Sequence, residues 1–178
     1  MPVIHSVEGM RRLGARIGSQ LQTGDVVVLS GPLGAGKTTL VQGLAQALGV
    51  QDAVTSPTFV IAREHRTPAG SFQHVDAYRL ANAAAFWDLD IDLQDSITVV
   101  EWGDVLLAEL VDDPVLVVRI EPDIQSGERR VTIDGTEQRW PPPVLAHVAS
   151  FAEFEPCVEI PADQHHSDRQ ADERPGGA

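Results

Sequence analysis

Hydrophobic side chains recur with two different periods in the first part of the chain. Over residues 6–21 they fall at every third or fourth position, which predicts a helix capped at its start by Ser6. Residues 26–29 are apolar without interruption, as in a strand that is buried on both faces of a parallel sheet. The helical period returns over residues 37–48 and stops at Gly49. The segment between the strand and the second helix is therefore a connecting loop.

Shorter apolar runs, separated by turn residues, follow in the middle of the chain. Pro57 holds the residue before it in an extended conformation, and the run at residues 58–61 predicts a strand. A turn at residues 68–70 and a returning strand at residues 71–76 complete a hairpin. The other predicted elements are a helix, a strand, a helix, two antiparallel strands and a last helix, at residues 81–87, 97–102, 105–110, 115–120, 130–133 and 144–154.

The composition changes after residue 140. Three prolines at residues 141–143 begin a segment that is rich in acidic residues, and from about Pro156 its composition is typical of a disordered chain. We therefore expect a domain over residues 1–140 and a proline-rich, acidic C-terminal extension over residues 141–178 that is partly disordered.

The charge of the chain excludes one broad class of function. A net charge of −13 and an isoelectric point near 4.7 argue against non-specific binding to nucleic acid, which needs a basic surface, so any RNA would be met through a partner. Neither a membrane-spanning run nor a signal peptide is evident, and we expect a cytoplasmic protein with no membrane contact. The single cysteine, Cys157, excludes an internal disulfide and a zinc site built from cysteines.

The loop after the first strand carries the strongest chemical signal. Running from Gly31 to Thr38, it reads GPLGAGKT and fits G-x-x-x-x-G-K-[ST] in full. Its glycines let backbone N–H groups surround phosphates, and the following helix directs its positive end at the same charge. Lys37 is expected to reach the β- and γ-phosphates, and the Thr38 hydroxyl to bind magnesium. The loop therefore predicts a site for a nucleoside triphosphate.

The basic residues of the chain set Lys37 apart. Lys37 is the only lysine, and the other twelve basic residues are arginines. A compact ammonium group inside a tight phosphate loop is a role that the larger, planar guanidinium cannot fill.

Two later strands carry acidic residues near their ends. Glu101 follows the apolar run at residues 97–100, and in open α/β sheets ligands bind beyond the carboxyl ends of the strands. Glu101 is therefore placed to face the magnesium of a bound nucleotide, where aspartate is the commoner residue. The alternative is an acid that meets only water. On the returning strand, His74 and Asp76 point to the same side because side chains alternate.

Four separated motifs stand in fixed order, at residues 34–39 (GAGKTT), 56–59 (SPTF), 74–80 (HVDAYRL) and 100–102 (VEW). Together they resemble the TsaE family, formerly YjeE, of bacterial P-loop ATPases, over about residues 1–140. The resemblance implies a three-layer α/β fold of the P-loop NTPase type, in which the central sheet is mainly parallel with additional antiparallel strands. It also implies a role in forming threonylcarbamoyl-adenosine next to the anticodon of tRNA.

The family's functional residues transfer to this chain one by one. Thr38 and Glu101 would coordinate Mg²⁺. Asp76 and Lys37 are the catalytic candidates, with Asp76 positioning water or ordering the magnesium shell. Thr58 lies where a switch-like loop would sense the γ-phosphate. The residues that would bind ATP are Leu33, Gly34, Ala35, Gly36, Lys37, Thr38, Thr39, Trp102 and Arg129.

The resemblance also implies partners. Proteins of this family bind TsaD and TsaB and use ATP hydrolysis to permit repeated turnover, without transferring the threonylcarbamoyl group themselves. We therefore expect an ATPase with low intrinsic activity that these partners stimulate, and contact with tRNA only through the complex. The chain departs from the family at Pro32, where aspartate is usual, so any contact made by that side chain is in doubt.

Two other functions fit the same loop. A small-molecule kinase would use Asp76 as the base for a substrate hydroxyl and Arg63, Arg66 or Arg79 to hold the transferred phosphate. A nucleotide-binding module would hold ATP without hydrolysing it. A guanine-specific switch is disfavoured because the single asparagine, Asn82, is not part of an N-K-x-D motif.

Overall fold

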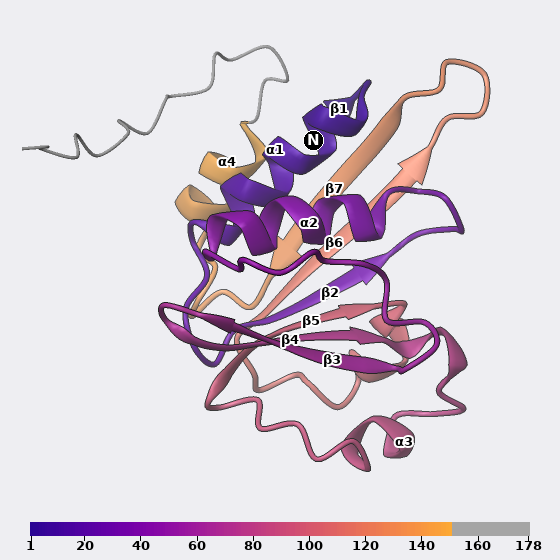
Figure 1. Ribbon diagram of the computed structural model, residues 1–178. Helices are drawn as coiled ribbons and strands as arrows, with labels where there is room; N and C mark the ends of the chain where they lie inside the picture. Colours follow the sequence, from indigo (N-terminus) through magenta and orange to yellow (C-terminus); the bar gives the residue numbers. More distant parts are fainter. Residues whose placement is uncertain (151–178) are drawn as a thin grey trace, which may run out of the picture.

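The computed structural model describes residues 1–150 (Figure 1). Its strands are β1 (Val3–Ile4), β2 (Val26–Ser30), β3 (Ala62–Thr67), β4 (Gly70–Asp76), β5 (Ser96–Glu101), β6 (Val115–Pro122) and β7 (Arg129–Gly135). Its helices are α1 (Val7–Gly18), α2 (Lys37–Ala47), α3 (Ala84–Trp87) and α4 (Pro142–Ala149), with 3₁₀ turns η1 (Ala77–Arg79) and η2 (Gly103–Leu106).

Within residues 1–150 the strands form one seven-stranded sheet in the order β1-β7-β6-β2-β5-β4-β3. Strand β2 pairs in parallel with β5 and β6, and β5 pairs in parallel with β4. The pairs β1-β7, β6-β7 and β3-β4 are antiparallel. The fold is therefore α/β with a mixed sheet, whose parallel strands lie at the centre and whose antiparallel strands lie at both edges.

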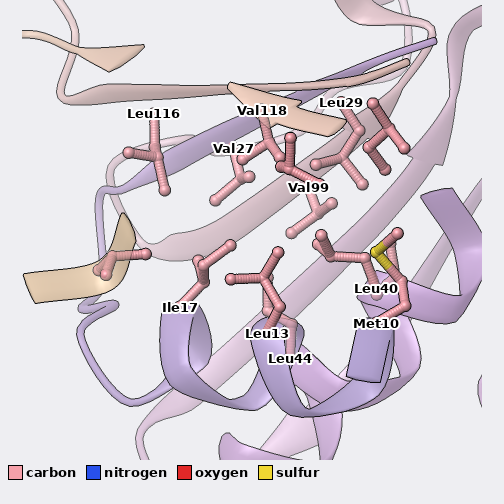
Figure 2. Packing of buried hydrophobic residues seen from close by; sticks show 14 of the residues in the cluster. Met10, Leu13, Ile17, Val27, Leu29, Leu40, Leu44, Val99, Leu116 and Val118 are labelled. Atoms are coloured by element: carbon pink, nitrogen blue, oxygen red, sulfur yellow. The ribbon is translucent and has the colours of Figure 1, made fainter. Parts of the chain in front are cut away.

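Each face of the sheet has its own hydrophobic core. Figure 2 shows the first core, in which side chains of α1 and α2 meet those of β2, β5 and β6: Met10, Leu13, Ile17, Leu40, Leu44, Val27, Leu29, Val99, Leu116 and Val118. The second core packs alternate strand residues against Phe86, Leu106 and Leu110. Since β2 contributes to both cores, the prediction that its apolar run is buried on both faces is confirmed.

Helices α1 and α2 approach each other closely through glycines. A Cβ atom at Gly43 would lie 1.8 Å from the backbone oxygen of Arg11, and one at Gly14 would lie 2.1 Å from the backbone oxygen of Leu40. Neighbouring backbone cannot move aside cheaply, so only glycine permits this contact. The contact holds α2, and with it the start of the helix at Lys37, against the sheet.

The predicted strand at residues 58–61 is wrong. The amides of Val60 and Ile61 both donate to the carbonyl of Pro57, at 2.8 and 2.7 Å, which closes a turn. Ile61 has a φ of 69°, in the left-handed region, so the chain reverses there and the strand begins at Ala62. The hairpin itself is confirmed, because β3 and β4 pair across the turn between Thr67 and Gly70.

Several helix boundaries also differ from the expected ones. The helix expected at residues 81–87 has four residues, and the helix expected at 105–110 is wrong, because the 3₁₀ turn η2 ends at Leu106 and residues 107–110 are not helical. The last helix, α4, ends at Ala149, and the expected extension after residue 150 lies outside the described residues. Helix α4 packs on α1, where the Arg16 guanidinium donates to the carbonyl of His147.

The division of the chain at residue 140 stays a prediction. Within residues 1–150, no helix is long and apolar enough to cross a membrane.

Replacing Gly43 by alanine tests the backbone contact between α1 and α2. Alanine favours a helix by about 1 kcal/mol over glycine. The clash with the Arg11 oxygen outweighs this gain, and we expect Gly43→Ala to lower the free energy of unfolding by about 1–3 kcal/mol. Urea unfolding of the two proteins measures the change. Gln46→Ala, at an exposed position of the same helix, should stay within about 0.5 kcal/mol of the parent. A Gly43→Ala protein as stable as the parent would contradict the contact.

Candidate functional site

A cleft of about 390 Å³ lies at the carboxyl ends of the parallel strands. It is formed by the loop between β2 and α2, the loop before β3, and the ends of β4 and β5. The residues that line it are Leu33, Gly34, Gly36, Lys37, Thr38, Thr39, Ser56, Thr58, Asp76, Glu101 and Trp102. Each of the four sequence motifs contributes residues to this cleft, and the SPTF motif does so through Ser56 and Thr58. The tertiary structure therefore brings all four motifs to one place.

The loop between β2 and α2 depends on its glycines. Gly31, Gly34 and Gly36 have φ angles of 143°, 76° and 111°, which residues with a Cβ rarely adopt. A Cβ at Gly31 would also lie 2.4 Å from the backbone oxygen of Ile120, so the loop rests directly against β6. Ala35 buries its side chain in the first core and is not among the residues that line the cleft.

Lys37 is buried inside the loop. Its Nζ donates to the carbonyl oxygens of Gly31, at 2.7 Å, and Pro32, at 3.0 Å, and lies 3.5 Å from the centre of a Trp102 ring. Burial lowers the pKa of Lys37, and the nearby carboxylates of Glu101 and other acids act in the opposite direction. The ammonium group therefore lies within the cleft, between the loop and the indole.

Trp102 owes its position to an unusual backbone conformation. Its φ is 61°, in the left-handed region, and its amide donates to the carbonyl of Leu29 at 2.8 Å. Its ring also contacts the ring of Tyr78, with centroids 5.1 Å apart. The indole is therefore held at the end of β5, over Lys37.

Two buried carboxylates face the start of α2. Strands β4 and β5 are parallel and in register, so Asp76 and Glu101 lie side by side at their ends. The Thr38 hydroxyl donates to the Glu101 carboxylate, with Oγ1 2.9 Å from Oε1 and 3.0 Å from Oε2. These are the hard oxygen donors that Mg²⁺ prefers. No group of three or more acidic, histidine or cysteine side chains among residues 1–150 could hold a metal alone. In a nucleotide site, phosphates and water complete the shell, so a hydroxyl with a carboxylate fits the ion.

Asp76 connects two segments of the site. The hydroxyl groups of Ser56 and Thr58 both donate to its Oδ2, and the amide of Tyr78 donates to its Oδ1 at 3.0 Å. The loop before β3 is therefore attached to the end of β4 through one carboxylate. Thr58 lines the cleft, and its expected role in sensing the γ-phosphate stays a prediction.

One residue of the site had no role assigned from the sequence. His74 is fully buried on β4, and its Nε2 lies 2.9 Å from Oε1 of Glu101. Alternation along the strand places it on the same side as Asp76, which was the available signal. That signal does not identify Glu101 as its partner, because the two residues are 27 positions apart and meet only through the pairing of β4 with β5.

The arginines lie outside the cleft formed by residues 1–150. Arg129 does not line the cleft. Its Nε is 4.0 Å from the position of a Cβ on Gly36, and it donates to the carbonyl of Gly127, so its expected contact with ATP stays a prediction. Of the three arginines considered for a kinase, none lines the cleft. Arg63 donates to the Thr55 hydroxyl and Arg79 to the carbonyl of Thr58, at 3.4 Å. The described residues therefore provide no pair of cations poised over the phosphate loop, as transfer to a second substrate would favour.

Residues 4–131 match the protein family described as threonylcarbamoyl adenosine biosynthesis protein TsaE. A relative named tRNA threonylcarbamoyladenosine biosynthesis protein TsaE, from Streptomyces coelicolor, is 48% identical over 138 residues, which cover 74% of this chain and 93% of the relative. The protein of the same name from Mycobacterium bovis is 50% identical over 139 residues, which cover 71% of this chain and 81% of that one.

A solved structure has a similar fold. The crystal structure of YdiB from Bacillus subtilis aligns with a TM-score of 0.66 and 25% sequence identity, over 84% of this chain and 92% of YdiB. The likeness thus covers most of this chain and supports the α/β fold. The chain belongs to the TsaE family and is a tRNA threonylcarbamoyladenosine biosynthesis protein.

Proposed function

We propose that this protein is a P-loop ATPase that binds ATP with Mg²⁺ and acts on TsaD and TsaB during formation of threonylcarbamoyl-adenosine in tRNA. It does not transfer the group itself, and it works in the cytoplasm, where tRNA is modified. The observation that carries the proposal is the meeting of the glycine loop, Lys37 and the Thr38–Glu101 pair in one cleft. A phosphate loop between a central parallel strand and a helix, with packed layers on both faces of the sheet, also supports a three-layer P-loop NTPase fold.

The loop has the features that a polyphosphate requires. Three glycines leave backbone N–H groups uncovered, and α2 adds the positive end of its dipole. Lys37 is a charge-assisted donor that can exchange its two carbonyl partners for phosphate oxygens, which bind an ammonium more strongly. Trp102 closes the side of the cleft next to this ammonium group. The triphosphate would therefore lie between the loop and the ends of β4 and β5.

Thr38 and Glu101 would hold Mg²⁺ next to that triphosphate. A bound magnesium ion neutralises charge that develops on the phosphate oxygens during hydrolysis. Asp76, beside Glu101, would order water in the shell of the metal or orient the water that attacks. Because Asp76 also holds Ser56 and Thr58, the same carboxylate would report the state of the phosphates to the loop before β3.

Exposed apolar side chains at the mouth of the cleft support regulation by partner proteins. Leu33 is 91% exposed and Phe59 is 92% exposed, each in a segment that lines the cleft. Large apolar side chains exposed next to a functional site are typical of a surface that a protein partner covers. The charge of −13 disfavours direct tRNA binding, so tRNA would be met through TsaD and TsaB.

Removing the Lys37 amine tests the phosphate site. We expect Lys37→Ala to weaken binding of a fluorescent ATP analogue by at least about 10- to 100-fold, because charge-assisted hydrogen bonds to phosphate are lost. The circular dichroism spectrum should be unchanged. Arg63→Ala removes an exposed cation on β3 that lies outside the cleft, and its affinity should match that of the parent. Retained ATP binding by Lys37→Ala would show that the loop is not the phosphate cradle.

Asp76→Asn tests hydrolysis separately from binding. The amide keeps one oxygen, which can accept from the Tyr78 amide, and its NH2 group can donate to the Thr58 hydroxyl, but it cannot take up a proton. With TsaD and TsaB present, we expect phosphate release to fall by about 100-fold or more while ATP affinity changes by less than about threefold. Asp104→Asn, an exposed acid near Lys37 that does not line the cleft, is the matched control. An unchanged rate in Asp76→Asn would show that Asp76 is not catalytic and would favour a module that binds without hydrolysing.

Phe59→Ser tests the partner surface. Because this side chain is exposed beside the cleft, we expect the variant to bind ATP like the parent and to lose about tenfold or more of the stimulation by TsaD and TsaB. Val111→Ser removes an exposed apolar side chain that precedes β6, at the opposite ends of the parallel strands, and should leave the stimulation unchanged. An equal loss of stimulation in Phe59→Ser and Val111→Ser would contradict a partner surface centred on Phe59.

A further inference from the structure

The hydrogen bond between His74 and Glu101 is fully buried. His74 is 0% exposed and Glu101 is 3% exposed, and the distance from Nε2 to Oε1 is 2.9 Å. A carboxylate can only accept, so the hydrogen lies on Nε2 and the histidine donates. Its other ring nitrogen, Nδ1, has no hydrogen-bond partner among the described residues. Glu101 is therefore the only hydrogen-bond partner of this imidazole within residues 1–150.

The imidazole is held in place from both sides. Its ring stacks on Phe72, with centroids 6.4 Å apart and an angle of 16° between the planes. On β5 it faces Val99, which is two residues before Glu101 and fully buried. A donor that packing locks in this way can fix the plane of the carboxylate it bonds. The Glu101 carboxylate is thus held between two elements, β4 through His74 and α2 through Thr38.

We propose that His74 is a positioning residue of the nucleotide site, which orients the Glu101 carboxylate toward Thr38 and toward the metal that this pair would hold. The inference rests on the proposed magnesium site. His74 bonds Oε1 from the side of β4, while the Thr38 hydroxyl lies 2.9 Å from the same oxygen and 3.0 Å from Oε2. Without this donor, the carboxylate could turn away from the buried carboxylate of Asp76 beside it, because like charges repel. The histidine acts through Glu101 and touches neither nucleotide nor metal.

A second buried histidine on the same hairpin provides the comparison. His65 on β3 also stacks on Phe72, with ring centroids 5.7 Å apart. It is buried, and its Nε2 has no hydrogen-bond partner among residues 1–150. His65 therefore shares the burial and the stacking of His74 but not the bond to Glu101. A merely structural role in the hairpin would make the two histidines equivalent.

The experiment measures how much Mg²⁺ strengthens binding of a fluorescent, non-hydrolysable ATP analogue, as the ratio of its affinity in excess Mg²⁺ to its affinity in EDTA. His74→Met lacks a donor, and His74→Gln has a similar length with an amide donor. We expect the ratio to fall by about tenfold or more in His74→Met and to stay within about threefold of the parent in His74→Gln and His65→Phe. Affinity in EDTA should be the same in all four proteins. His74→Phe, which keeps an aromatic ring on Phe72, should behave like His74→Met.

Three outcomes would overturn the inference. The first is a parental ratio in the apolar variants, and the second is an equal fall in His74→Gln and His74→Met. The third is that both apolar variants fail to fold by thermal unfolding while His74→Gln folds, since this would make His74 a requirement of the core instead. Failure of the magnesium site itself is recognised separately with Glu101→Gln. If the parent shows no Mg²⁺ effect, or Glu101→Gln shows the parental ratio, the proposed site is wrong whatever His74 does.

Discussion

Three charged side chains are buried together at the carboxyl ends of the central strands, and the geometry of the site follows from satisfying them. Lys37, Asp76 and Glu101 are each at most 5% exposed. Removing such groups from water is costly unless each is paired and hydrogen-bonded. Lys37 donates to carbonyl oxygens of the loop. Asp76 accepts from hydroxyl groups and an amide, and Glu101 accepts from Thr38 and His74. These partners come from different segments, so the network determines how α2, β4 and β5 meet.

The rest of the fold holds these segments where the network needs them. Glycines let α1 press against the backbone of α2, and Gly31 lets the phosphate loop rest on β6. Parallel register sets Asp76 beside Glu101, and two hydrophobic cores clamp the central strands from both faces. The positions of the polar groups thus depend both on close backbone packing and on the conformation of the loop. Under the proposed function, a cleft built in this way is organised before a nucleotide enters it.

Under the proposed function, the main output of this site is a conformational signal that depends on the state of the γ-phosphate. Asp76 would act on the phosphates while holding Thr58, and Phe59, the next residue, is almost fully exposed. A change at the γ-phosphate would therefore reach the surface over very few residues. Such an arrangement suits an ATPase whose output is a change in its partners. It suits a kinase less, because the arginines that could hold a transferred phosphate lie outside the cleft formed by residues 1–150.

Features that depend on neighbouring residues could be predicted from the sequence. The phosphate loop, the buried strand β2 and the helices on either side of it follow from glycines that permit positive φ and from two hydrophobic periods. The apolar run at residues 58–61 predicts a strand, but the segment is a turn. The run does not reveal that the carbonyl of Pro57 accepts hydrogen bonds from two amides. Three contacts were not predictable from the sequence: His74 bonds Glu101, Thr58 bonds Asp76, and Arg129 lies next to Gly36 outside the cleft. Each of these contacts joins residues far apart in the chain, and the bond between His74 and Glu101 exists because the register of β4 and β5 places the two residues together.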